Sequence, residues 1–166
     1  MENKLLNVEK IKEAYNNKNY VVLNNAIDLK KFNINFNFDS MFALNAVRKF
    51  EFAQKTNVIG QILGLNKEPL FHEYLKYIDF NFKKIFSYNI GNLDFFYSID
   101  GNKGISHVDP EHVVIVGVKN VTFYHLNNVD IAINEGDLLY IHRDIWHHSF
   151  SSRERIVLSL SLFELF

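Results

Sequence analysis

The chain contains no cysteine among its 166 residues. This absence excludes disulfide bonds, thiolate zinc sites and a cysteine nucleophile, but it does not fix the cellular compartment. An excess of one charge is also missing, because 18 Lys and Arg face 19 Asp and Glu, for a formal net charge of -1. The overall charge therefore gives no reason to expect binding to nucleic acid or to an anionic membrane.

Long hydrophobic runs are absent as well. No window approaches the roughly 18 uncharged apolar residues that a membrane-spanning helix needs. The first residues, Met1 to Asn7, lack the apolar run of a signal peptide. We therefore expect a cytoplasmic protein with no membrane association. No linker and no internal repeat interrupts the chain, so we expect one domain over residues 1–166.

Aromatic residues are plentiful, in contrast to these absences. The chain has 16 Phe and 8 Tyr, and 48% of its residues are apolar. Disordered chains are poor in aromatics and rich in net charge, so disorder is not expected. A chain of this length can bury a substantial hydrophobic core.

The first half of the chain, residues 1–84, has a mixed pattern in which helices dominate. Residues 6–18 place apolar side chains near one helical face, and residues 20–23 are typical of a strand. Residues 39–53 form the best helical pattern, with a possible cap at their start. Residues 68–78 predict another helix, beginning at a proline near its first turn.

The second half, residues 85–166, has the pattern of an all-β structure. Short apolar or alternating runs recur at intervals of about 8–12 residues with turn residues between them, which is typical of an antiparallel sandwich or barrel. We therefore predict a mostly β, α+β fold, with a β-barrel core and flanking N-terminal helices. The predicted strands are 95–99, 113–116, 121–124, 129–133, 138–141 and 155–163.

A possible metal site stands out in this second half. His107 and Asp109 form a His-x-Asp pair, and His147 lies on a later strand-like stretch. Two imidazoles and one carboxylate on one face of a metal leave up to three coordination positions open, as in non-haem Fe(II) oxygenases. By itself, a His-x-Asp pair is equally well explained as a turn residue beside a solvated carboxylate.

The surroundings of His147 add to this pattern. Gly136-Asp137 makes a turn into an apolar strand that stops at His142, and Trp146 directly precedes His147. A rigid sheet can present an imidazole at its rim in this way, although His147 could instead be a half-buried histidine packed by Trp146. Because successive strand residues point to opposite faces, only one of His147 and His148 would be a ligand.

These two stretches resemble the metal-binding motifs of the JmjC and cupin-like 2-oxoglutarate oxygenases. Residues 98–109 resemble the first motif, and residues 136–148 resemble the second, which runs Gly-Asp, apolar strand, kink, aromatic residue and His. The resemblance covers residues 93–163. It implies a double-stranded β-helix (cupin or jelly-roll) barrel, with 2-oxoglutarate as co-substrate and O2 as oxidant. It also implies Fe(II) held by three ligands, His107, Asp109 and His147.

The chain departs from the family pattern in two places. His142 stands where the family has a kink proline. The family binds the distal carboxylate of 2-oxoglutarate with a basic residue, for which this chain offers three alternatives. An ungapped comparison places Thr122 there, a shorter hairpin places Lys119 there, and related oxygenases use an arginine on the last strand, here Arg155. A buried carboxylate without such a partner would be costly.

Other polar residues have weaker claims to the site. Tyr97 and Tyr124 are candidates to donate a hydrogen bond to a co-substrate carboxylate, although buried strand tyrosines commonly belong to the core. Glu111 and His112 resemble the additional ligands of ordinary cupins, although His112 could simply begin a strand. His72 and His125 have no motif support, and Lys119 could be a solvated turn residue.

Three functions follow from these patterns. The first is an Fe(II)- and 2-oxoglutarate-dependent oxygenase that oxidises a C–H bond of a small molecule, an amino acid or a peptide. The second is a metal cupin that does not use 2-oxoglutarate, such as a dioxygenase, isomerase or epimerase. The third is a metal-free β-barrel that binds a partner or ligand. The apolar end, residues 162–166, is compatible with a homodimer interface or with a buried last strand.

Overall fold

The computed structural model of the chain describes residues 6–34, 59–100 and 103–165. The helix predicted over residues 39–53 lies outside these ranges. The described helices are α1 (Val8–Asn16), α3 (His72–Phe82) and the short 3-10 turns η1 (Leu29–Phe32), η2 (Leu65–Lys67) and η3 (Pro69–Phe71). The strands are β1 (Tyr20–Leu23), β2 (Ile59–Ile62), β3 (Tyr88–Asp100), β4 (His112–Lys119), β5 (Thr122–Leu126), β6 (Val129–Ile133), β7 (Leu138–Ile141), β8 (His147–Phe150) and β9 (Arg153–Glu164).

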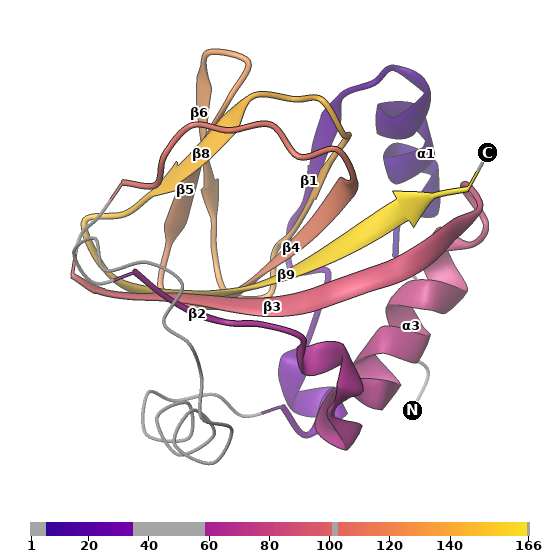
Figure 1. The fold of residues 1–166 in the computed structure, drawn as a ribbon, viewed down its shortest axis with the longest axis horizontal. Coiled ribbons are helices and arrows are strands. Elements are labelled where there is room, and N and C mark those ends of the chain that lie inside the picture. The colour runs from indigo at the N-terminus through magenta and orange to yellow at the C-terminus, as the bar shows by residue number, and fades with distance from the viewer. Residues whose placement is uncertain (1–5, 35–58, 101–102, 166) are drawn as a thin grey trace.

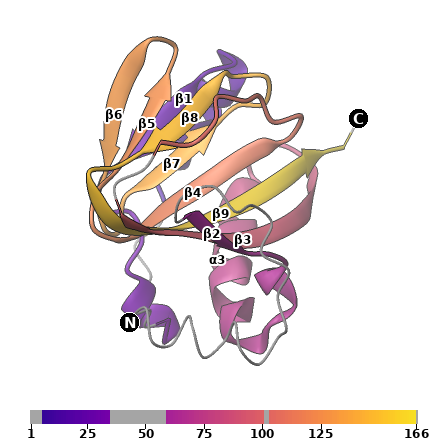
Figure 2. The same ribbon diagram turned by 60° about the vertical axis from the view of Figure 1, so that its left-hand side comes forward.

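The strands form two antiparallel sheets that face each other (Figure 1). The large sheet has the order β1-β7-β4-β9-β3-β2, and the small sheet has the order β6-β5-β8. Residues 103–107 run beside β8 and bridge to it at Lys103 and His107. Figure 2 shows α3 on the far side of the large sheet from the small sheet. The predicted mostly β jelly-roll with N-terminal flanking helices is therefore confirmed.

Alternation along the strands divides the apolar side chains between two cores. On β4, Val114 and Val116 belong to a core that includes residues of α1 and α3. Val113 and Ile115 belong to a second core, which fills the space between the two sheets. One face of the large sheet therefore supports the helices, and its other face lines the barrel interior where a site can form.

The N-terminal helices follow local sequence signals. The side chain of Asn7 caps α1 by accepting a hydrogen bond from the backbone N–H of Lys10 at 3.3 Å. The helix predicted over 68–78 is present, but Pro69 opens a 3-10 turn and the α-helix itself runs from His72 to Phe82. Among the described residues, no helix has both the length and the apolar character to cross a membrane.

Strand β3 is longer than predicted, since it begins seven residues before Phe95, at Tyr88. Its register with β9 shifts between Ile90 and Leu93. Such a bulge interrupts the period-2 alternation by which a strand is recognised from sequence. Strand β2 was not predicted, and it places Gly60 opposite Tyr97.

Candidate metal centre

The site is built from two backbone segments of the chain that pair at the edge of the small sheet. His147 is the first residue of β8, and His107 pairs with it from the segment that follows β3. Asp109 lies two residues further along, where its carbonyl accepts a hydrogen bond from the backbone N–H of Asp144 at 3.1 Å. The loop before β8 is therefore tied directly to the His-x-Asp segment, which fixes all three side chains in one place.

The donor atoms of these three residues lie within 4.8 Å of one another. Nε2 of His147 is 3.3 Å from Oδ2 of Asp109, and Nε2 of His107 is 3.7 Å from Oδ1 of the same carboxylate. The side chain of His147 is only 5% exposed, whereas that of His107 is 53% exposed. The group therefore has one side in the barrel wall and one side open to solvent.

Backbone carbonyls hold both imidazoles in the form that a metal needs. Nδ1 of His107 lies 2.8 Å from the carbonyl oxygen of Ile105, and Nδ1 of His147 lies 2.9 Å from that of Ile145. A carbonyl oxygen only accepts, so each Nδ1 donates its proton and each neutral ring keeps its lone pair on Nε2. Both Nε2 atoms face Asp109, as ligands of a shared ion must.

The charges of the site are coupled even without a metal. Burial alone would lower the pKa of His147, but the hydrogen bond and negative charge of Asp109 and the Ile145 carbonyl raise it above its usual value. Burial would raise the pKa of Asp109, but its contacts with His147 and His107 hold that pKa below its usual value. A divalent cation would replace the proton that these two groups compete for.

The donor set fits a metal of the iron type. Two neutral imidazoles and one carboxylate are the donors of a facial triad, in which the open positions accept further ligands. The carbonyls that hold Nδ1 are the outer partners that orient such histidines. Because the side chain of His107 is half-exposed, solvent reaches the triad from this side.

Strand pairing determines which neighbouring residues share the interior with this triad. Along β5 the side chains alternate between buried and half-buried, and the buried ones include Thr122 and Tyr124. Tyr124 pairs with Ser149 on β8, and Leu126 pairs with His147. Residues that pair across strands point to the same face, so these side chains point into the barrel together with His147.

A buried cation stands in the same interior. Arg155 is only 5% exposed, and its Nη2 donates a hydrogen bond to Oγ of Ser149 at 3.0 Å. Its Nη1 is buried and has no hydrogen-bond partner among the described residues. A guanidinium left half-paired in this way is costly, and burial lowers its pKa. An anionic ligand that enters the barrel would satisfy it.

Two more polar groups lie in the same interior as Arg155. Within the part of the chain that the structure describes, the Oγ1 of Thr122 is also buried without a hydrogen-bond partner. Burial raises the pKa of Tyr124 to about 12, Arg155 acts to lower it, and Asp109 acts to raise it. The pKa of the Tyr124 hydroxyl therefore responds to the charges of both Asp109 and Arg155. A carboxylate-bearing ligand that spans these groups fits the donors present. Sequence reasoning missed Ser149, because nothing in its local pattern marks it.

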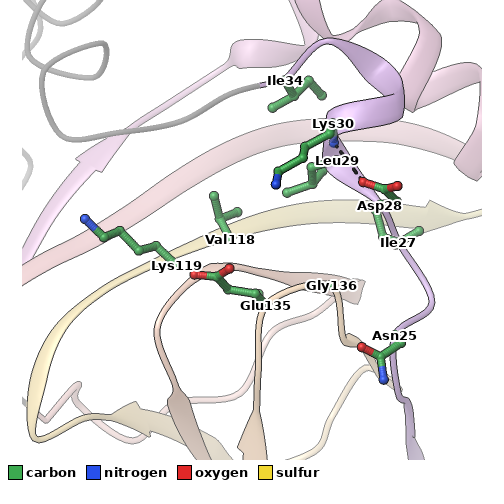
Figure 3. Close-up of a pocket in the computed structure, with 11 residues that line it drawn as sticks. Asn25, Ile27, Asp28, Leu29, Lys30, Ile34, Val118, Lys119, Glu135 and Gly136 are labelled. Carbon is green, nitrogen blue, oxygen red and sulfur yellow. Dashed lines mark hydrogen bonds between the residues drawn. The ribbon is translucent and has the colours of Figure 1, made fainter.

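Lys119, another candidate for the distal carboxylate, lies elsewhere. Gly117 pairs with Val157, whose side chain faces the interior, but a register shift then places Lys119 opposite Ile156. Ile156 belongs to the core on the helix side. Lys119 lines a separate cavity of about 460 Å³ outside the barrel, together with Lys30 and other residues (Figure 3). No residue of the metal triad lines that cavity.

The other candidate residues also lie away from the triad. Tyr97 belongs to the helix-side core, and its ring lies against Gly60. His112 is fully buried, and its Nδ1 accepts hydrogen bonds from the hydroxyl of Tyr140 and the backbone N–H of Arg143. Glu111 accepts a hydrogen bond from Ser161. The structure thus brings together His107, Asp109, His147, Thr122, Tyr124 and Arg155, but not Lys119, Tyr97, Glu111 or His112.

Two exposed apolar side chains flank the triad. Trp146 directly precedes His147 and is 65% exposed, and Ile105 lies two residues before His107 and is 75% exposed.

At the end of the chain, Leu162 is buried while Phe163 and Leu165 are exposed. The predicted homodimer interface stays a prediction.

No family model matches the chain, and no curated protein matches its sequence. Solved structures share its fold. The ribosomal oxygenase YcfD from Escherichia coli superposes with a TM-score of 0.74 at 18% identity, over 100% of this chain and 54% of YcfD. YcfD in complex with cobalt and 2-oxoglutarate gives a TM-score of 0.70 at 18% identity, over 99% of this chain and 54% of YcfD. The chain thus spans about half the length of YcfD.

A shorter neighbour has a similar fold. The non-haem α-ketoglutarate-dependent epimerase SnoN from nogalamycin biosynthesis superposes with a TM-score of 0.70 at 11% identity, over 95% of this chain and 83% of SnoN. The predicted resemblance to the JmjC and cupin-like oxygenases is therefore confirmed at the level of the fold.

Proposed function

We propose that this protein is an Fe(II)- and 2-oxoglutarate-dependent oxygenase that oxidises a C–H bond of a second substrate. One observation carries the proposal. The half-paired buried guanidinium of Arg155 stands in the same interior as a facial triad of His107, Asp109 and His147. A dicarboxylate with a metal-binding end and a distal carboxylate matches both groups at once. The likeness to YcfD and SnoN supports this proposal, because YcfD is described as an oxygenase that binds cobalt and 2-oxoglutarate, and SnoN as a non-haem α-ketoglutarate-dependent epimerase.

In the proposed site, His107, Asp109 and His147 hold the iron on one face. When bound, Fe(II) with 2-oxoglutarate and O2 supplies the oxidation, with succinate and CO2 as the products of the co-substrate. Asp109 balances part of the metal charge, and the carbonyls of Ile105 and Ile145 keep both rings oriented.

The remaining residues act on the co-substrate. Arg155 binds the distal carboxylate through the N–H groups that lack a partner, and Thr122 donates its buried hydroxyl to the same group. Tyr124 interacts electrostatically with both Arg155 and Asp109, and its neutral hydroxyl donates to the co-substrate without adding charge. The apolar side chains around them, such as Leu126 and Val157, keep water from the bound co-substrate.

The second substrate approaches from the open side. His107 is half-exposed there, and Trp146 and Ile105 offer apolar contact beside it. This rim suits a small molecule, an amino acid or a peptide side chain.

The test begins with the metal-free protein under anaerobic conditions. Calorimetry is expected to show 2-oxoglutarate binding only after Fe(II) or Co(II) is added, and addition of O2 is expected to yield succinate in an iron-dependent manner. Arg155→Met provides the matched variant, because it removes the guanidinium and keeps a side chain of similar length. If the metal binds and 2-oxoglutarate does not, the protein is a metal cupin of another kind.

The reaction outcome has a second candidate. SnoN is described as an epimerase, and this chain covers 83% of it. Both outcomes begin at a C–H bond, so product analysis by mass decides between them: hydroxylation adds one oxygen atom, and epimerisation leaves the mass unchanged.

A further inference from the structure

The outer face of the small sheet carries an unusual row of polar and aromatic residues. Alternation that turns Tyr124 and His147 into the barrel turns their neighbours His125 and His148 outward. His125 pairs with His148 on β8 and with Asp130 on β6. Three strands therefore place Asp130, His125 and His148 side by side on one face, outside the barrel.

The two imidazoles of this row are at a chelating distance. Their ring centroids are 5.1 Å apart, and their planes differ by 22°. Two imidazoles that share a tetrahedral ion through metal–nitrogen bonds of about 2.0–2.1 Å have centroids about 5 Å apart. The rings of the inner pair, His107 and His147, are 4.4 Å apart. The centroid spacing of the outer pair thus suits one shared ion, which the stacked rings can bind once they turn so that their Nε2 lone pairs converge.

Both outer rings are held through the same atom. Nδ1 of His125 lies 2.5 Å from Oδ1 of Asp130, and Nδ1 of His148 lies 2.9 Å from Oγ of Ser106. A carboxylate on Nδ1 fixes the ring so that Nε2 carries the free lone pair. The hydroxyl of Ser106 can accept a hydrogen bond from Nδ1 of His148, and in that tautomer Nε2 of His148 also carries the free lone pair.

Both Nε2 atoms remain available. Neither has a hydrogen-bond partner among the residues that the structure describes. The Nε2 atom of His148 is also not completely buried. The side chain of His125 is 37% exposed. His148 is only 8% exposed, so an ion reaches this pair from the side of His125.

We propose that His125 and His148 bind a divalent transition-metal ion of the zinc type at a second site, on the outer face of the small sheet. Asp130 and Ser106 position the two rings. Imidazole is a preferred ligand of Zn, Cu and Ni ions. Water completes the coordination, since the chain supplies two ligands. This site does not depend on the proposed function of the inner triad.

The experiment uses Zn²⁺ alone and a full-length chain whose inner site is silenced by His107→Gln with Asp109→Asn. Titration calorimetry near neutral pH, in a buffer that does not bind metal, is expected to show one zinc ion bound per chain. Adding His125→Gln or His148→Gln is expected to weaken this binding by at least about 10-fold, and Asp130→Asn by about 10-fold, because outer partners of ligating histidines typically contribute that much.

His72→Gln is the matched control. His72 lies exposed on α3, with no histidine partner among the described residues, so its loss is expected to leave zinc binding unchanged. Circular dichroism and thermal unfolding check that each variant folds. If zinc does not bind to the silenced chain, or binds equally after both His125→Gln and His148→Gln, the proposal is overturned.

A second measurement needs no variant. Zn²⁺ added to the unaltered chain is expected to protect His125 and His148 from diethyl pyrocarbonate, measured by peptide mass spectrometry, and to leave His72 reactive. Equal modification of His125 and His148 with and without zinc would also overturn the proposal.

Discussion

His107 and His147 exchange both of their backbone hydrogen bonds. The N–H of His107 donates to the carbonyl of His147 at 3.0 Å, and the N–H of His147 donates to the carbonyl of His107 at 2.9 Å. Residues paired in this way have side chains on the same face of a sheet. The convergence of two imidazoles that are distant in sequence therefore rests on main-chain pairing.

This pairing makes a prediction about the metal ligands. His147→Ala is expected to weaken Co(II) or Fe(II) binding by more than about 100-fold, since loss of an outer partner alone costs about 10–100-fold. Trp146 is the only tryptophan of the chain and lies beside His147, so quenching of its fluorescence reports the binding. His148→Gln is expected to preserve the high-affinity quenching, because His148 faces outward. Loss of that signal in His148→Gln with retention in His147→Ala would reverse the assignment.

Replacement of the half-paired Arg155 is expected to weaken ligand binding without weakening the stability of the fold. Arg155→Met is expected to weaken 2-oxoglutarate binding to the Co(II) form by about 10- to 100-fold, through loss of charged hydrogen bonds. The same change is expected to leave the free energy of unfolding of the metal-free protein unchanged or to raise it by about 1 kcal/mol, because it removes a buried charge without a full set of partners. Calorimetry and urea unfolding measure the two effects.

Lys119→Met is the control for this pair of measurements. Lys119 lines the cavity outside the barrel, so its loss is expected to leave 2-oxoglutarate binding unchanged. Weaker binding in Lys119→Met and normal binding in Arg155→Met would contradict the placement of the anchor.

The lowered pKa of His112 predicts how the stability of the protein changes with pH. Burial, with the nearby charge of His142, lowers the pKa of His112 to about 4. An unfolded chain takes up this proton near the usual value of about 6.5, and the folded chain does so only near 4. Between these values the unfolded state binds more protons, so stability falls as pH falls, by up to about 1.4 kcal/mol per pH unit from this group.

The matched variant for this pH dependence is His112→Gln, whose amide oxygen can still accept from Tyr140 and from the N–H of Arg143. Urea unfolding at several pH values is expected to give a shallower loss of stability below about pH 6.5 than in the unaltered chain. Parallel curves for the two proteins would show that His112 does not titrate in this way.

The contact between Gly60 and Tyr97 makes a prediction about packing. A Cβ at position 60 would lie 1.9 Å from Cζ of Tyr97, so Gly60→Ala forces the ring to move. We expect it to destabilise the protein by about 1–3 kcal/mol, as overpacking of a core does. Tyr97→Leu combined with Gly60→Ala is expected to recover part of that loss in thermal unfolding. Additive losses in the double variant would mean that the two positions do not clash.

Tyr97 and Tyr124 are expected to differ in role, Tyr97 as a core residue and Tyr124 as a residue that binds the co-substrate. Because its ring belongs to the helix-side core, Tyr97→Phe is expected to leave 2-oxoglutarate binding unchanged, whereas Tyr124→Phe is expected to weaken it. Calorimetry on the Co(II) forms compares the two variants, and a larger effect at Tyr97 would contradict the proposed site.

Local sequence patterns predicted much of the barrel. Turn residues and short apolar or alternating runs marked β4 to β7 and β9, since each depends on neighbours along the chain. The turn before β7 is one example: Gly136 has a φ of +80°, and Asp137 accepts hydrogen bonds from the backbone N–H groups of Asn25 and Asn134 at 2.8 Å. Strand β2 and the start of β3 were missed, because a bulge and polar residues hide the alternation there.

The sequence by itself determined the types and order of the groups considered for the candidate site: a His-x-Asp pair, a later His after an aromatic residue, and two cations, Lys119 and Arg155. Only the tertiary structure decided which cation lies in the barrel interior with the metal triad. Alternation alone would turn Lys119 to the same face as Gly117, but one extra residue in the β4–β9 pairing reverses that face. Arg155 keeps its register opposite Ser98 and points inward. Register is set by contacts between strands distant in sequence, and these contacts leave no local pattern.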